Sequence, residues 1–348
     1  MKTLKTELIK EIFLKNKQSN LFGKWIRLHD IKENLEKSKN TAEVLEIGKS
    51  EEERPIYSIK LGNGSKRILI WTQMHGNEST GTKALFDVLN YFSNESDKNV
   101  TTILQNCTLL CIPMLNPDGA EKYTRVNGNA IDLNRDAVDR KAIESKLLRT
   151  VLENFNPHFC FNMHDQRTIF SVEGTKNPAT VSFLAPSEEI ERKITKGRKQ
   201  TMNVIVAMNT LLQQIIPNHV GRYTDEFYPA ATGDNFQKLG FNCILIESGH
   251  FYNDYERERS REFTFYALLQ GVYHIATAEN YNDFDAYFEI PNNAQLFFDS
   301  IKRSEKETVG YQYKDEIIDG EFLSKLERIE DFDVNYKIGL NEIDFESE

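Results

Sequence analysis

The chain has 348 residues, of which 39% are hydrophobic and 28% charged, a composition typical of a soluble globular protein. This length is enough for one large α/β domain or for two ordinary domains. The formal net charge of −10 argues against a general nucleic-acid binder or anionic-membrane binder, since both need a basic surface. No stretch approaches the roughly 20 apolar residues that cross a bilayer, and the N-terminus has no secretory signal pattern.

The four cysteines all lie in or beside apolar runs; they are Cys107, Cys111, Cys160 and Cys243. These cysteines could form disulfides, but we interpret them as small buried thiols. A reducing, cytoplasmic location fits this pattern best.

Helices and strands are predicted in alternation along the chain. Amphipathic helices are expected over 1–20 and over 30–40, the second capped by Asp30, and a meander of strands over 41–73 follows. Continuous apolar runs predict interior strands at 67–73, 107–115, 158–163 and 243–248. Apolar residues at helical spacing or long helical patterns predict helices at 79–93, 141–155, 187–214 and 255–277.

This alternation predicts the fold class α/β. Residues 1–278 are expected to form one three-layer α/β/α domain with a mixed, mostly parallel central sheet. After about residue 279 the sequence changes to short mixed runs and acidic turns. Residues 279–348 are therefore expected to be a small appendage of a helix and a few strands with an acidic tail. Neither the role of this appendage nor the oligomeric state follows from the sequence.

Polar side chains gather just past the ends of the predicted interior strands. His75 and Glu78 follow the first strand, the NPDG segment at 116–119 follows the second, His164 follows the third and Glu247 ends the fourth. In open α/β sheets, sites form outside the carboxyl ends of the strands. We therefore expect these four segments to meet.

His75, Glu78 and His164 are candidate metal ligands. A single His-x-x-Glu pair is common by chance, but two imidazoles and a carboxylate form a set with which catalytic zinc keeps one position open. His158 begins the strand that His164 follows, and at about 3.3 Å per residue their backbones lie roughly 20 Å apart. The two cannot bind the same ion.

Glu247 is the candidate general base. A carboxylate at the end of a very apolar strand is costly unless it is paired or functional. Desolvation should raise its pKa and a nearby cation should lower it, which leaves a base usable near neutral pH. His250 offers a rival, in which Glu247 and His250 bind the metal, but that site would lose its obvious base.

Three further residues belong near this cluster. Asp132 is expected either to hold a ligand imidazole through its far nitrogen or to serve as a helix cap or turn residue. Arg125 and Arg135 flank the segment 126–134. Arginine in a loop is usually only solvated, but two beside a metal cluster suggest binding of a carboxylate and of a developing oxyanion.

Together these segments resemble the zinc metallocarboxypeptidases of the carboxypeptidase A type. The resemblance covers roughly residues 40–278 and rests on the order and spacing of six motifs. They are IGKSEEERPIY (47–57), HGNE (75–78), NPDG (116–119), DLNRD (132–136), NMHD (162–165) and LIESGH (245–250).

The resemblance implies a zinc-dependent hydrolase that removes C-terminal residues from peptides. It implies that His75, Glu78 and His164 bind one zinc ion, and that Glu247 is the base that activates a zinc-bound water. Arg125 matches the arginine that polarises the scissile carbonyl, and Asp132 matches the aspartate behind the first histidine.

Substrate-binding residues are implied in the same way. Asn134 and Arg135 match the pair that binds the terminal carboxylate of the peptide. Tyr228 matches a mobile tyrosine that covers this carboxylate, with Tyr223 as a competitor. Asp234 either approaches the floor of the primary pocket, where it would favour basic side chains, or caps a helix or turn.

Some features depart from the family pattern. Glu53 stands where the family usually has glycine, and Asn77 stands where animal digestive members have arginine. No activation prosegment precedes the domain, which suggests no zymogen control.

Two other functions stay open. HGNE and DLNR also occur in the succinylglutamate desuccinylase and aspartoacylase group, whose members deacylate N-acyl amino acids and carry a C-terminal β appendage. The substrate is accordingly expected to be a peptide or an N-acyl amino acid. A metal-free binding protein that keeps the fold is the third possibility, which the intact ligand set and Glu247 disfavour.

Overall fold

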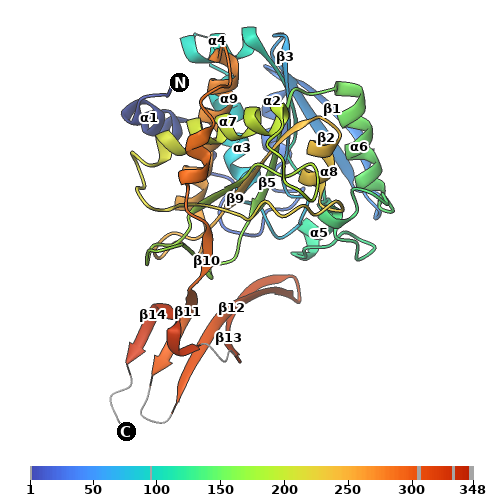
Figure 1. The fold of residues 1–348 in the computed structure, drawn as a ribbon. Coiled ribbons are helices and arrows are strands. Elements are labelled where there is room, and N and C mark those ends of the chain that lie inside the picture. The colour runs from blue at the N-terminus through green and yellow to red at the C-terminus, as the bar shows by residue number, and fades with distance from the viewer. Residues whose placement is uncertain (1, 95, 304–306, 331–333, 345–348) are drawn as a thin grey trace.

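The computed structural model describes residues 2–94, 96–303, 307–330 and 334–344. A central sheet lies between layers of helices, and a smaller sheet follows it at the C-terminal end of the chain (Figure 1). The predicted three-layer α/β/α fold is confirmed. Within the described ranges, no helix combines the length and the apolar character needed to cross a membrane.

The central sheet is mixed and mostly parallel, in the order β1-β2-β4-β3-β5-β9-β7-β8. Its strands are β1 (Glu43–Lys49), β2 (Pro55–Leu61), β3 (Lys66–Trp71), β4 (Cys107–Ile112), β5 (Phe159–Asp165), β7 (Val181–Leu184), β8 (Val220–Arg222) and β9 (Asn242–Ser248). The middle strands β4, β3, β5 and β9 run parallel to one another. These four are the strands that the apolar runs predicted, so their carboxyl ends meet at one edge.

The middle strands are apolar throughout because both faces of the sheet are covered. Successive side chains of a strand point to opposite faces, and on β3 Ile68 enters one hydrophobic core while Leu69 enters the other. The first core packs against α1 (Thr6–Asn16), α2 (Lys32–Ser38), α3 (Thr80–Phe92), α4 (Lys98–Asn106), α7 (Lys196–Leu212) and α9 (Glu258–Thr277). The second core packs against α6 (Ile143–Phe155) and α8 (Thr232–Lys238).

Local differences from the predicted elements have local causes. The helix expected over 187–214 begins only at Lys196, where the side chain of Thr195 caps it. The prediction that Asp30 caps the second helix is wrong, because its carboxylate accepts hydrogen bonds from the backbone and side chain of Arg27 instead. Glu53 has a φ of 61°, a left-handed conformation that glycine adopts more readily.

The chain after α9 first stays with the α/β layers. The 3-10 helix η2 (Asp285–Glu289) buries Tyr287 in the first core, and β10 (Asn293–Gln295) pairs with β6 (Phe170–Val172). The boundary at residue 278 therefore stays a prediction. All four cysteines are buried and unpaired, as the thiol interpretation expected.

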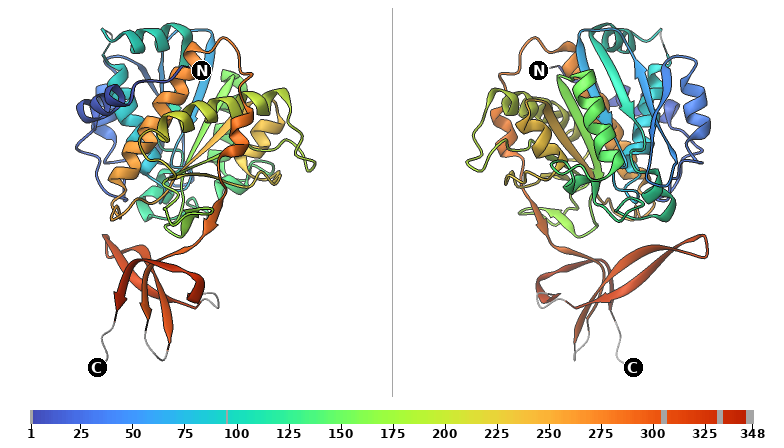
Figure 2. Two further views of the ribbon diagram at one scale, coloured as in Figure 1. Left: turned by 60° about the vertical axis from the view of Figure 1, so that its left-hand side comes forward. Right: turned by 90° about the vertical axis from the view of Figure 1, so that its right-hand side faces the viewer.

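A four-stranded sheet in the order β13-β12-β11-β14 forms the rest of the appendage. Its elements are β11 (Phe297–Arg303), β12 (Thr308–Ile318), β13 (Glu321–Ile329), the 3-10 helix η3 (Val334–Tyr336) and β14 (Ile338–Asp344). Among the described residues after Thr277, the helices are 3-10 turns and no α-helix is present, so the helix expected there is not observed. The acidic tail at 345–348 lies outside the described residues. Figure 2 shows this sheet at one end of the layers rather than against a face.

Candidate metal centre

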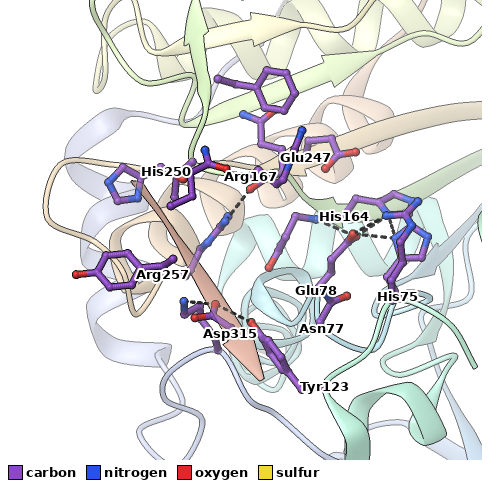
Figure 3. Close-up of a pocket in the computed structure, with 18 of the residues that line it drawn as sticks. His75, Asn77, Glu78, Tyr123, His164, Arg167, Glu247, His250, Arg257 and Asp315 are labelled. Carbon is purple, nitrogen blue, oxygen red and sulfur yellow. Dashed lines mark hydrogen bonds and ion pairs between the residues drawn. The ribbon is translucent and has the colours of Figure 1, made fainter. Parts of the chain in front are cut away.

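Three ligand-type side chains meet at the carboxyl edge of the middle strands. His75 and Glu78 lie in the turn between β3 and α3, and His164 lies near the end of the neighbouring strand β5. One ligand atom from each lies within 4.8 Å of the others, and Figure 3 shows the three side chains pointing toward one another. The predicted convergence of these segments is observed.

The distances within this cluster fit a single small cation. Nδ1 of His75 lies 2.8 Å from one oxygen of Glu78, and Nδ1 of His164 lies 2.8 Å from the other. The two Nδ1 atoms face each other at 3.1 Å. Two imidazole nitrogens and a carboxylate form a tetrahedral zinc set with one position left for water or substrate, so the residues present fit the ion that the resemblance implies.

The protonation states of Glu78 and His164 suit metal binding. Burial raises the pKa of Glu78, but the two imidazoles outweigh burial and hold it below its usual range. Burial lowers the pKa of His164, which keeps its ring neutral. Burial also lowers the pKa of His75, although the carboxylates of Glu78 and Asp132 more than offset it. An ionised carboxylate and neutral imidazoles are the forms that bind zinc, so the ion has to displace a proton at His75 but not at His164.

Asp132 has both of the roles that the sequence left open. Its Oδ1 lies 3.0 Å from Nε2 of His75, which leaves Nδ1 of that ring directed at the metal position. The same oxygen accepts a hydrogen bond from the backbone N–H of Asn134, at the start of the 3-10 helix η1 (Leu133–Arg135). Oδ2 accepts from Nε of Arg125 at 2.9 Å. Asp132 therefore couples the ligand His75 to the loop that carries both arginines.

Replacing Asp132 with alanine is expected to weaken zinc binding by about 10–100-fold, because an outer-shell partner that orients a ligand imidazole is worth that much. Competition with a chromogenic chelator would measure the change. Asp139→Ala is the matched control, since this exposed aspartate of the same loop forms an ion pair with Lys141 at the surface. A zinc affinity equal to that of the unaltered protein would remove Asp132 from this role.

Glu247 lies beside the metal ligands with a free carboxylate. It is the register partner of His164 on the parallel strand β9, so both side chains point to the same face. Its carboxylate makes no hydrogen bond or ion pair with any described residue, and it lines the pocket described below. Burial raises the pKa of Glu247, the charges of Glu78 and Asp165 raise it further, and Arg125 acts against them. Such a carboxylate can accept a proton.

Some of the residues expected to bind substrate line the pocket of the metal ligands, and others do not. Arg125, Asn134 and Arg135 line the same pocket as the metal ligands. Tyr228 does not line this pocket; it is 54% exposed, and its ring lies 5.0 Å from the guanidinium carbon of Arg135. Its substrate-binding role stays a prediction. The competitor Tyr223 does line the pocket.

Asp234 does not line this pocket. It lies in the first turn of α8, and its carboxylate accepts a hydrogen bond from the backbone N–H of Tyr228. Burial raises the pKa of Asp234 to about 6. The helix-terminus alternative therefore describes Asp234 better, because one of its oxygens accepts a hydrogen bond from the backbone.

The pocket is a cavity of about 630 Å³ in which the C-terminal sheet takes part. Figure 3 shows Asp315 across the cavity from the metal ligands. The appendage contributes Asp299 from β11 and Gln312, Tyr313, Lys314 and Asp315 from β12. Sequence reasoning missed these residues, because no local pattern connects them with the metal ligands.

Specific contacts fix the sheet in this place. Asp315 accepts hydrogen bonds from Lys24 and from the hydroxyl of Tyr123. Phe322 packs edge-on against Tyr123, with ring centres 5.0 Å apart. Ring contact between Tyr255 and Tyr313 adds a third point of attachment. The C-terminal sheet is thereby one wall of the pocket.

The sequence was compared with known protein families. The sequence profile of the family "Zinc carboxypeptidase" matches residues 28–200, about half of the chain and the part that holds all three metal ligands. The chain belongs to the zinc carboxypeptidase family. Glu247 lies beyond the matched segment, so its assignment in this family member rests on the structure and on the motif order.

The curated relatives of this zinc carboxypeptidase-family chain are similar over short stretches. It is 26% identical over 103 residues to carboxypeptidase 2 of Trichophyton rubrum, which is 29% of this chain and 19% of that protein. It is 29% identical over 119 residues to human carboxypeptidase D, which is 29% of this chain and 9% of that protein. The chain thus spans a fifth or less of these relatives.

Solved structures share the fold over a larger part of the chain. A metallo-carboxypeptidase from Burkholderia cenocepacia superposes with a TM-score of 0.59 at 19% identity, over 72% of this chain and 69% of that one. Bovine thrombin-activatable fibrinolysis inhibitor, solved with a tick carboxypeptidase inhibitor, gives 0.56 at 16% identity, over 72% of this chain and 97% of that one. At these identities the likeness concerns the fold.

Proposed function

We propose that this protein is a zinc-dependent metallocarboxypeptidase that hydrolyses the C-terminal amide bond of peptides. The observation that carries the proposal is the meeting of three groups in one pocket: the His75–Glu78–His164 set, the unpaired carboxylate of Glu247 and the guanidinium of Arg135. Membership of the zinc carboxypeptidase family supports it. The buried thiols accord with a cytoplasmic location, which is part of the proposal.

Each residue has a task that its position allows. Asn134 and Arg135 bind the terminal carboxylate of the peptide and orient its last amide bond, since a guanidinium forms a forked contact with a carboxylate. Zinc held by His75, Glu78 and His164 would supply Lewis acidity and lower the pKa of a water.

Two residues act on the reacting atoms. Glu247 accepts a proton from the attacking water and passes it to the nitrogen of the leaving amine, so that one carboxylate serves as base and then as acid. Arg125 stabilises the negative charge that develops on the carbonyl oxygen. Its guanidinium is already held close to the metal ligands, 3.2 Å from Glu78.

Mass-spectrometric profiling of peptide cleavage tests the proposal. The zinc-loaded protein is expected to release single residues from the C-terminus, to stop when a chelator is added, and to resume when zinc is restored. Peptides that differ only in the last residue measure the side-chain preference, and equal rates for lysine and phenylalanine would show that Asp234 takes no part in it. Unchanged cleavage in the chelator, or none with zinc, would contradict the proposal.

A second candidate is an N-acyl-amino-acid deacylase. The observation that favours it is the wall of β12 residues across the pocket from the metal ligands, which limits the length of a substrate on that side. Acetyl- and succinyl-amino acids in the same assay separate the two activities. Release of free amino acid from these compounds, with no trimming of peptides, would favour the deacylase.

A further inference from the structure

Two arginines that the proposed reaction does not use line the pocket. Arg257 donates hydrogen bonds to three backbone carbonyls, those of Ser248 at 2.7 Å, Gly249 at 3.1 Å and Gln166 at 2.7 Å. Arg167 is exposed and makes no hydrogen bond or ion pair with any described residue. Neither guanidinium has a carboxylate partner in the part of the chain that the structure describes.

The carbonyls fix the direction of Arg257 without neutralising its charge. They belong to the ends of β9 and β5, the strands that carry Glu247 and His164, so the guanidinium is held at the metal edge of the sheet. Asp165, the nearby acid of β5, is bonded to Thr80 rather than to Arg257. The charge of Arg257 lowers the pKa of Asp165 and of Glu247, but its guanidinium is bonded to neither carboxylate. It can therefore still form a direct contact with the carboxylate of a ligand.

His250 adds an unsatisfied polar group to the same region. It lines the pocket, is only 2% exposed, and neither ring nitrogen has a hydrogen-bond partner among the described residues. Buried polar groups nearly always have a partner, so a bound group is expected to supply one. Burial, with Arg257 and Lys24 nearby, lowers the pKa of His250 to about 3, which leaves a neutral ring able to donate one hydrogen bond and accept another.

These groups lie on the side of the metal ligands that the terminal carboxylate does not use. Asp132 contacts the outer nitrogen of His75, so the helix η1 that carries Arg135 begins on the His75 side. Figure 3 shows Arg257 and His250 on the opposite side, away from His75. A substrate bound by its terminal carboxylate at Arg135 would extend toward them with the acyl side of its scissile amide.

We propose that Arg257, Arg167 and His250 form a second anion-binding subsite that takes a carboxylate on the acyl side of the scissile amide. The side chain of an acidic penultimate residue and the free carboxylate of a dicarboxylic acyl group share this chemistry. The proposal rests on the proposed function only for the direction in which the substrate lies. The wall of β12 keeps the acyl portion short.

Binding measured without turnover tests this subsite. Isothermal titration would use the zinc-loaded Glu247→Gln protein and two isosteric pairs of ligands. The first pair is Ala-Glu-Phe and Ala-Gln-Phe. The second is N-succinyl-phenylalanine and the derivative in which the free carboxylate of the succinyl group is an amide. The acidic member of at least one pair is expected to bind about tenfold tighter or better, as for a charge-assisted contact with arginine. The pair with the larger ratio identifies the source of the carboxylate.

Variants in the same background locate the contact. Arg257→Gln and Arg167→Gln should each bring the ratio within a pair toward one, whereas Arg259→Gln should leave it unchanged, because this exposed arginine of α9 pairs with Glu262 outside the pocket. Arg167 forms no hydrogen bond or ion pair within the described ranges, so Arg167→Gln remains informative even where Arg257→Gln fails to fold. Arg135→Gln should weaken both members of each pair equally.

The outcomes separate this subsite from the proposed function. Equal or undetectable affinity for both members of both pairs, or ratios unchanged in Arg167→Gln and Arg257→Gln, would overturn the subsite. Turnover by the unaltered enzyme would still support the peptidase in that case. Tight binding of an acidic ligand, together with no cleavage of any substrate by the unaltered enzyme, would support the subsite and contradict the proposed function.

Discussion

Glu247→Gln is expected to lower kcat by about 10²–10⁴-fold, the contribution typical of a positioned general base. The amide keeps the size of the carboxylate but cannot accept the proton of the attacking water. Zinc content and substrate affinity should be retained, because the carboxylate of Glu247 forms no hydrogen bond or ion pair with any described residue. Steady-state kinetics on a C-terminally cleaved peptide, with zinc analysis of the same sample, measure both quantities.

The pH profile gives this prediction an internal control. In the unaltered enzyme kcat/KM should fall as the pH drops through the pKa of Glu247, because the protonated acid is no longer a base. Burial raises that pKa, so the fall should come at a higher pH than for an ordinary glutamate. The Gln variant should lose this limb. Near-normal turnover, or an unchanged acid limb, would show that another group is the base.

His164→Ala is expected to leave a protein that holds no zinc after dialysis and shows no activity above background. Only two of the three protein ligands remain, so the loss of affinity should exceed the roughly 10–100-fold that a missing outer-shell partner costs. Elemental analysis of the dialysed protein gives the zinc content. One ion per chain is expected in the unaltered protein.

His158→Ala is the matched control for His164→Ala. His158 immediately precedes β5, the strand that carries His164 near its carboxyl end, and its ring accepts a hydrogen bond from the backbone N–H of Arg67. Zinc content and activity should therefore be unchanged in this variant. A full complement of zinc in His164→Ala would mean that the ion is bound elsewhere.

The sequence alone determined the α/β layers and the metal cluster. Apolar runs such as 243–248 predict strands covered on both faces, because successive side chains of such a strand are all buried and must be apolar. Parallel strands then bring their carboxyl ends to one edge, so His75 and His164, 89 positions apart, meet without any further information. Glu247 follows from the same rule, since it is the register partner of His164.

Only the tertiary structure decided how the rest of the pocket is built. The sequence left Asp234 between the pocket floor and a helix cap or turn, and its carboxylate accepts a hydrogen bond from the backbone N–H of Tyr228. Lys24 and Asp315 are separated by 291 positions, and their ion pair helps to hold β12 against the pocket. Side-chain direction and the docking of a distant sheet depend on contacts between remote segments, which local periodicity does not encode.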